Sequence, residues 1–271
     1  MEEKKTEKKI DKKKIYKILF VVFVVGFVIS LGVLLSDMYT RWQEQKRLES
    51  LAGNNTETEF IEETETEEDL YTRLGIEIPE KNLDWAVLNE TNPDIYAWIY
   101  IPNTNIDYPV LQHETDDSFY LRRDIDGKKS TAGSIYSEHS YNGKEFDDFN
   151  TVLYGHNMRA KTMFQNLHFF EDATFFEENR YVYIYLPEKV LVYEIFAAYE
   201  FSDRHILANY STISDAGKLK YLDDVFGVRD MRAHFREGIE VTVENHLLTL
   251  STCIDKKPNN RYLVQGILIE E

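Results

Sequence analysis

A single cysteine near the carboxyl terminus is the residue in this chain best suited to covalent chemistry. Cys253 is the only cysteine among 271 residues, and it directly follows the stretch His246–Thr252, which is rich in leucine and threonine. That composition predicts a largely buried strand, so the thiol would stand on a rigid support at the strand's end. The alternative is a small buried hydrophobe, which is the common fate of a free cysteine.

A cysteine nucleophile needs a neighbour that helps to supply the thiolate, because the unperturbed pKa of a thiol is about 8.5. Of the seven histidines, only His156 directly follows a short apolar segment and a glycine, in Leu153-Tyr154-Gly155-His156-Asn157-Met158. This arrangement predicts a strand end, with Gly155 permitting a close approach of the backbone. His168 lies in a stretch that we expect to be helical and His234 near a helix end, where solvent or core roles are favoured. By position alone, any one histidine is more often structural than catalytic.

A thiol nucleophile also needs a donor for the oxyanion of its tetrahedral intermediate. Arg261 begins the next predicted strand, and the residues Ile254–Asn260 can return the chain beside the cysteine. Arginine is always charged and presents a fork of donors, which suits a developing negative charge. The alternative, an ordinary exposed arginine at a strand edge, is favoured by position alone. Asp255 could orient a partner, but a solvated loop aspartate is the favoured interpretation.

The composition excludes several classes of function. Lysine and arginine number 31 against 48 acidic residues, which gives a net charge of -17. An acidic chain without a basic, aromatic-interleaved stripe is a poor nucleic-acid binder, so we expect no nucleic-acid partner. The sequence contains no CxxC or HExxH pattern, no GxGxxG and no Walker-type loop. We therefore expect neither a metal nor a cofactor, and the chemistry must come from side chains.

The amino-terminal region predicts a membrane anchor. Residues 1–17 hold eight lysines against four acidic residues, and an uncharged run, Ile18–Leu35, follows them. With Ile15 and Tyr16 this run roughly matches a bilayer core, and the preceding lysines place the amino terminus in the cytoplasm. The alternative is a cleaved signal peptide. The run is longer than a usual signal core, and residues 36–41 lack an Ala-x-Ala site, so an uncleaved anchor is favoured.

These observations divide the chain into four parts. We expect a basic cytoplasmic tail at 1–14, a transmembrane signal anchor at 15–36, a stalk and acidic linker at 37–79, and an extracytoplasmic domain at 80–271. The stretch Asn54–Asp69 contains eight acidic residues and no sustained apolar periodicity, which is typical of a solvated spacer. The protein is therefore expected to be a single-pass protein of the cell membrane.

Strand patterns dominate the expected extracytoplasmic domain. The candidates, in chain order, are 96–101, 106–111, 133–136, 151–154, 181–186, 190–201, 241–243, 246–252 and 261–269. Helical patterns are fewer: 84–89, 162–170 and a longer one at 215–235. Many strands with one substantial helix inserted late predict a closed or nearly closed β-barrel.

Three segments in the same order resemble one enzyme family. The sequence Thr249-Leu250-Ser251-Thr252-Cys253, the segment Tyr154–Met158 and the strand from Arg261 are similar to those of the sortases, the cysteine transpeptidases of Gram-positive cell surfaces. The finer resemblance is to class B, through Asn92–Ile99, Ile106–Val110 and Ser118–Leu121, and through the helix before the cysteine strand. The similarity covers roughly residues 80–271. It implies a mainly β fold, a sortase-type closed barrel of about eight strands with peripheral helices.

The resemblance also implies a role for each site residue. Cys253 would be the nucleophile, His156 the acid/base and Arg261 the oxyanion stabiliser. Leu121, Ser251, Ile206 and Leu207 would line the substrate groove.

The implied reaction is a transpeptidation at the cell surface. The enzyme would cleave a carboxy-terminal sorting motif of the Asn-Pro-x-Thr or Ser-Pro-x-Thr type after threonine, through a thioacyl-enzyme. An amine of a peptidoglycan stem peptide or a lipid-linked precursor would then resolve it. The implied partners are surface proteins that bear the sorting signal. No cofactor is implied.

Three alternatives remain open at this point. A class B enzyme could polymerise pilins instead of attaching single proteins. A secreted cysteine hydrolase would use the same cysteine and histidine but release its acyl group to water. A membrane-tethered binding or sensing domain could carry an inert thiol.

Overall fold

The computed structural model describes residues 12–52 and 70–270, and the chain divides into two units between Leu51 and Ala52. The first unit is one helix, α1 (Lys12–Leu51). Its part from Phe23 onward reaches a mean hydropathy of 1.8 with none of that window buried, so α1 is long and apolar enough to cross a membrane by length and composition. Most of the predicted basic tail (residues 1–11) and of the acidic linker (residues 53–69) lies outside the described residues.

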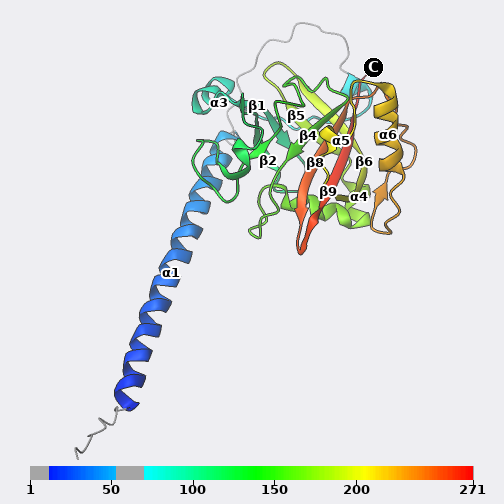
Figure 1. Ribbon diagram of the computed structural model, residues 1–271. Helices are drawn as coiled ribbons and strands as arrows, with labels where there is room; N and C mark the ends of the chain where they lie inside the picture. Colours follow the sequence, from blue (N-terminus) through cyan, green and yellow to red (C-terminus); the bar gives the residue numbers. More distant parts are fainter. Residues whose placement is uncertain (1–11, 53–69, 271) are drawn as a thin grey trace, which may run out of the picture. The chain divides into compact units, whose positions relative to one another are not determined.

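The second unit is built on a closed barrel of eight strands (Figure 1). The strands follow one another around the barrel in the order β5-β1-β2-β3-β4-β8-β9-β6, and pairing of β5 with β6 closes it. A short ninth strand, β7 (His234–Phe235), pairs with β6. The barrel strands are β1 (Ile95–Tyr100), β2 (Asp107–Leu111), β3 (Ile135–Tyr136), β4 (Asn150–Tyr154), β5 (Tyr181–Tyr185), β6 (Val190–Ser202), β8 (Leu247–Ile254) and β9 (Lys257–Leu268). The predicted barrel is thus confirmed.

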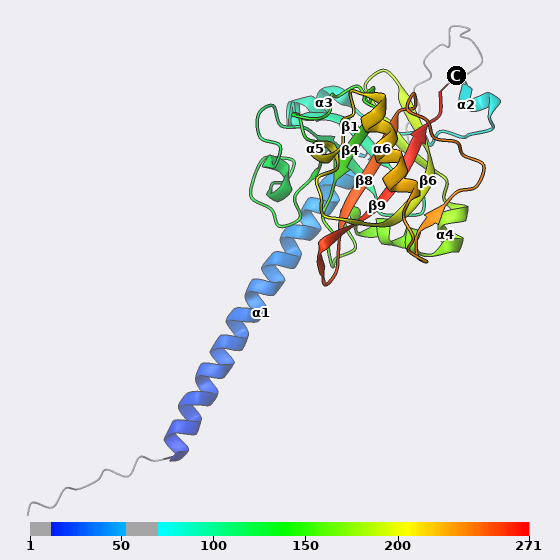
Figure 2. The same ribbon diagram turned by 45° about the vertical axis from the view of Figure 1, so that its right-hand side comes forward.

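Short helices surround the barrel in the described part of the chain. They are α2 (Leu70–Arg73), α3 (Trp85–Thr91), η1 (Phe119–Arg122), η2 (Phe164–Glu171), α4 (Ala173–Glu178), α5 (Ile206–Asn209) and α6 (Asp215–Phe226). Of these, η1 and η2 are 3₁₀ helices. Helix α6, the expected helix before the cysteine strand, lies across the outside of the barrel (Figure 2). Its Tyr221, Leu222 and Val225 are buried in a cluster with residues of β6, β8 and β9.

Helix α6 is shorter than the predicted stretch 215–235. The Ser214 side chain caps its first turn, and the backbone N–H of Gly227 closes its last turn on the carbonyls of Asp223 and Val225. A Cβ at this position would lie 2.7 Å from the Asp223 carbonyl oxygen, so glycine permits this close approach at the end of the helix. The chain beyond it forms a loop and then β7, so the helical periodicity seen in the sequence extends past the real end. The predicted strand at 241–243 is irregular backbone.

The middle of β8 is buried on both faces. Leu247, Leu248, Thr249 and Leu250 are all at most 1% exposed, because the barrel interior and α6 cover opposite sides of the strand. Such two-sided burial explains why the sequence shows a nearly continuous apolar run. The polar Thr249 is accommodated because its hydroxyl donates to Asn150 Oδ1 at 2.7 Å and accepts from Gln265 Nε2 at 2.7 Å. These bonds tie together β4, β8 and β9.

The β8–β9 hairpin is tighter than the sequence predicts. Only Asp255 and Lys256 form the turn, where Lys256 has a φ of 62°, and β9 already begins at Lys257. The predicted connection of seven residues is therefore wrong. Beyond Cys253 the register shifts, and Ile254 pairs with Lys257. Pro258 lies in this shifted part of β9, where a residue without an N–H costs no ladder hydrogen bond to β8.

Candidate active site

Strand register brings the three predicted chemical residues to one rim of the barrel. Strands β4 and β8 run parallel, with Tyr154 opposite Ser251, so His156 and Cys253 each follow two residues later on the same side. Strands β8 and β9 run antiparallel, with Cys253 directly opposite Arg261. Three residues that are distant in sequence therefore meet because of the pairing of three adjacent strands.

Backbone contacts fasten the His156 segment to the Cys253 segment. The Gly155 N–H donates to the Ser251 carbonyl at 3.1 Å, and the Thr252 hydroxyl donates to the Gly155 carbonyl at 2.8 Å. A Cβ on Gly155 would lie 2.6 Å from both Ile135 Cδ1 and the ring of Phe164. Glycine is thus the residue that permits this close approach, as the sequence predicts.

A cleft of about 260 Å³ opens at this rim. Cys253, His156 and Arg261 line it, together with Leu121, Ser251 and Ile206 from the predicted substrate groove. The other lining residues are Tyr136, Tyr154, Gly155, Phe201, Ser202, Asp203, Arg204, His205, Thr252 and Leu263.

Leu207 is the one predicted groove residue that the structure places elsewhere. It is 8% exposed and packs in the core cluster that contains Tyr210, Leu222 and also Ile206, which is 5% exposed. Helix α5 is a single turn, and successive residues of a helix point about 100° apart. Both side chains are buried, but only Ile206 also borders the cleft.

The three chemical side chains differ in how they are held. The Cys253 side chain is exposed at the rim. His156 Nε2 lies 2.7 Å from the Leu121 carbonyl oxygen, and a carbonyl only accepts, so this ring nitrogen carries a proton and donates it. Arg261 Nη1 donates to the backbone carbonyls of Pro258 and Asn260, each at 3.0 Å. The imidazole and the guanidinium thus have fixed orientations beside an accessible thiol.

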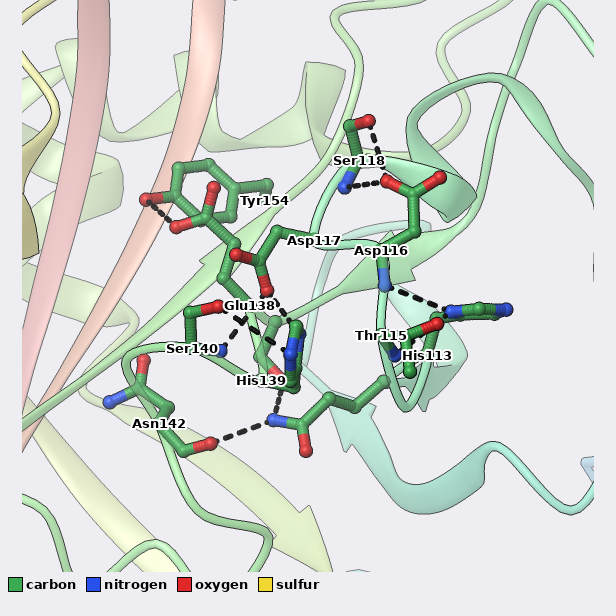
Figure 3. Close-up of polar contacts among 12 residues, drawn as sticks. His113, Thr115, Asp116, Asp117, Ser118, Glu138, His139, Ser140, Asn142 and Tyr154 are labelled. Carbon is green, nitrogen blue, oxygen red and sulfur yellow. Dashed lines mark hydrogen bonds and ion pairs between the residues drawn. The ribbon is translucent and has the colours of Figure 1, made fainter.

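A partly buried carboxylate, that of Glu138, supports the part of the cleft that Tyr154 and His205 line. Glu138 accepts from the Tyr154 hydroxyl at 3.2 Å, as Figure 3 shows, and from His205 Nε2 at 2.7 Å. His205 Nδ1 accepts the Ala208 N–H at 3.0 Å, so Nε2 is the protonated nitrogen of this ring. Burial raises the pKa of Glu138, and burial together with this carboxylate raises the pKa of Tyr154, which keeps its hydroxyl protonated as a donor. This network orients Tyr154 and the start of α5.

A second acidic residue lies next to this part of the cleft. Asp117 Oδ1 is 2.5 Å from His139 Nδ1 and accepts the Ser140 N–H at 3.1 Å (Figure 3). These contacts fix the loop after β3 to the loop before η1.

The sequence alone does not identify several residues that contact the site. His205 precedes the predicted groove residue Ile206, and Tyr154 lies two residues before His156. Their nearness in sequence to predicted residues is the feature that could have identified them. His168, for which solvent or core roles were favoured, lies with its Nε2 3.0 Å from the Cys253 carbonyl oxygen. Asn157, which directly follows His156, donates to the same carbonyl at 2.9 Å.

A closed mixed barrel with a cysteine, a histidine and an arginine at one rim is the arrangement of a sortase-type cysteine enzyme. A family model described as "Sortase domain" matches residues 99–269, so the chain belongs to the sortase family.

The similar proteins are sortases of class B. Sortase B of Listeria monocytogenes is 28% identical over 243 residues, which are 88% of this chain and 93% of that protein. The X-ray structure of Clostridium perfringens sortase B is 34% identical with a TM-score of 0.61, covering 68% of this chain and 99% of that one. A Staphylococcus aureus sortase B–substrate complex is 27% identical with a TM-score of 0.59, covering 69% of this chain and 84% of that one. The predicted resemblance to class B sortases is confirmed, and membership of the family makes the protein a cysteine transpeptidase at the family level.

Proposed function

We propose that this protein is a class B sortase that cleaves a carboxy-terminal sorting motif after threonine and joins the threonine to a peptidoglycan amine. The observation that carries this proposal is the meeting of Cys253, His156 and Arg261 in one cleft, with Cys253 exposed. The motif is of the Asn-Pro-x-Thr or Ser-Pro-x-Thr type. Leu121, Ser251 and Ile206 bind it in the cleft.

In this mechanism the Cys253 thiolate attacks the threonine carbonyl carbon, and Arg261 stabilises the oxyanion of the tetrahedral intermediate. His156 protonates the departing amine as the carbon–nitrogen bond breaks, which leaves a thioacyl-enzyme. A wall amine then attacks the thioester and loses a proton, and Cys253 departs as a thiolate. The second step forms an amide bond, so the peptide bond that was broken is replaced.

We further propose that residues 15–36 anchor the protein once in the cell membrane, with the tail 1–14 in the cytoplasm and residues 37–79 as stalk and linker. The catalytic domain, 80–271, then lies outside. The lysines before the apolar run and the length of α1 support this topology. An anchored enzyme meets exported proteins and lipid-linked wall precursors at the same membrane surface.

The first prediction tests the reaction itself. The full-length protein in detergent should cut a fluorescent peptide containing Asn-Pro-x-Thr or Ser-Pro-x-Thr, and mass spectrometry should find an added oligoglycine or stem-peptide amine joined to the threonine. A peptide with the threonine and proline exchanged is the matched control and should stay intact. Release of the free acid, with no amide product across several amines, would instead identify a cysteine hydrolase.

The second prediction concerns the oxyanion donor. Arg261→Lys keeps the charge but loses the planar fork that the Pro258 and Asn260 carbonyls hold in place. Thioacyl formation should fall by about 10²–10³-fold, the usual cost of losing such a donor. The matched control is Arg232→Lys, because Arg232 pairs with Glu200 and Asp230 and does not line the cleft. Near-normal single-turnover rates for both Arg261→Lys and Arg261→Ala would exclude this role.

A further inference from the structure

The backbone carbonyl of Cys253 receives two hydrogen bonds from side chains outside its own hairpin. Asn157 Nδ2 donates at 2.9 Å, and His168 Nε2 lies at 3.0 Å from the same oxygen. Asn157 belongs to the segment after β4, and His168 to the helix η2. The carbonyl next to the thiol is therefore fixed from two separate elements.

His168 is itself held from two further directions. Its Nδ1 lies 2.6 Å from Glu171 Oε1, one turn later in η2, and its ring stacks on Tyr262 at a centroid distance of 5.2 Å. The side chain of His168 is 14% exposed, whereas that of Glu171 is 42% exposed. The ring is thus clamped between an aromatic face and a carboxylate.

The proton positions follow from the partners. The Cys253 carbonyl oxygen and the Glu171 carboxylate can only accept, so the ring donates to the first through Nε2–H and to the second through Nδ1–H. Asn157 Nδ2 lies 3.1 Å from Nε2 and could donate to a bare ring nitrogen, but that nitrogen would then place its lone pair against the Cys253 carbonyl oxygen. Glu171 meets the other nitrogen, Nδ1, and fixes the orientation in which Nε2 points at Cys253.

The two hydrogen bonds to the Cys253 carbonyl lie at the point where the regular β8–β9 pairing ends. Cys253 pairs with Arg261 in register, but the ladder shifts directly afterwards, between Cys253 and Ile254. The peptide plane after the nucleophile is therefore not fixed by the regular pattern of the sheet. That plane shares the Cys253 Cα, so its rotation would swing the direction of the thiol.

We propose that His168, oriented by Glu171, is a positioning residue that aims the thiol of Cys253 by holding its backbone carbonyl. The inference rests on the proposed function, in which Cys253 is the nucleophile. We assign His168 no proton transfer to the substrate, because both of its ring nitrogens are engaged, Nδ1 by Glu171 and Nε2 by the carbonyl of Cys253, and it does not line the cleft. Its contribution is geometric, and a displacement of about 1 Å at a reacting centre can cost about 10²-fold in rate.

The test compares His168→Ala with His168→Gln in the full-length protein. Alanine removes the donor, whereas the glutamine amide can place an N–H near the position of Nε2. We expect His168→Ala to lower kcat for peptide cleavage by about 10- to 100-fold with little change in KM. His168→Gln should recover a large part of that loss. His246→Ala, at the opposite end of β8, is the matched control and should behave as the wild type.

Two further measurements separate aiming from unfolding or loss of thiolate. Alkylation of Cys253 by iodoacetamide should stay near the wild-type rate in His168→Ala, because a small reagent can approach from many directions. Glu171→Ala, at a more exposed site, should lower kcat in the same way but by less, and it tests the idea even if His168→Ala folds poorly.

The possible outcomes distinguish a failure of this inference from a failure of the proposed function on which it rests. Wild-type kcat in both His168→Ala and Glu171→Ala, with Cys253→Ala inactive, would overturn the positioning role alone. Equal losses in alkylation and in peptide cleavage, or no recovery in a folded His168→Gln, would also overturn it. Turnover retained in Cys253→Ala would remove the proposed nucleophile and this inference with it.

Discussion

Cys253→Ala is expected to reduce both peptide cleavage and thioacyl formation to the uncatalysed background. The chain contains one cysteine, so no second thiol can take over the attack. Intact-protein mass spectrometry after mixing with the sorting peptide should show the acyl adduct on the wild type and none on the variant. Melting temperature should change little, because the side chain is exposed and alanine removes only the sulfur.

The same assignment can be checked without a mutation. A methanethiosulfonate reagent should block the wild-type enzyme in proportion to the labelled fraction, and a reductant should restore the activity as the mixed disulfide is cleaved. Substantial turnover in Cys253→Ala, or in a fully labelled wild type, would show that the chemistry lies elsewhere.

His156→Ala is expected to slow thioacyl formation from the peptide by about 10²–10⁴-fold, the usual contribution of general acid–base catalysis. The leaving amine would have no proton donor as the carbon–nitrogen bond breaks. A quenched reaction at saturating peptide, in which mass spectrometry follows the thioacyl adduct over time, measures this step. His113→Ala is the matched control, because His113 lies in an exposed loop away from the cleft, where its Nδ1 accepts the N–H groups of Thr115 and Asp116.

A substrate with a different leaving group tests the role of His156 more sharply than the loss of rate in His156→Ala with the peptide. An activated ester of the same acyl segment expels a group that needs no proton, so His156→Ala should slow its reaction far less than that of the peptide. Equal slowing of ester and peptide would contradict a role in protonating the leaving group.

The fold class could be predicted because burial leaves its pattern within single segments. The two-sided burial of β8 appears as a nearly continuous apolar run. Eight of the nine described strands match predicted ones; β7 was not predicted, and the predicted strand at 241–243 did not form. The ends of elements were harder to predict. Gly227 stops α6 well before the predicted end, and the Asp255–Lys256 turn contains no glycine or proline to indicate how tight it is.

The site could be predicted only in part, for a related reason. Cys253, His156 and Arg261 stand in short segments whose pattern is visible in the sequence, and the family resemblance gave their roles. The contact of His168 with the Cys253 carbonyl depends on how η2 packs against β8, and no periodicity encodes that packing. Leu207 and Ile206 are neighbours in one helical turn, so the sequence could not say which of them faces the cleft.

The parallel pairing of β4 with β8 has a consequence for the order of folding. The bond from the Thr252 hydroxyl to the Gly155 carbonyl joins residues 97 positions apart, and the chain between them includes β5, β6 and α6. We expect contacts of such long range to form late, because the entropic cost of closing a long loop comes before the stabilising contact is made. The thiol is also synthesised after the histidine segment, because Cys253 follows His156 in the chain. A partly folded chain therefore holds the two halves of the cleft apart, and the barrel must close before the cysteine and the histidine can act together.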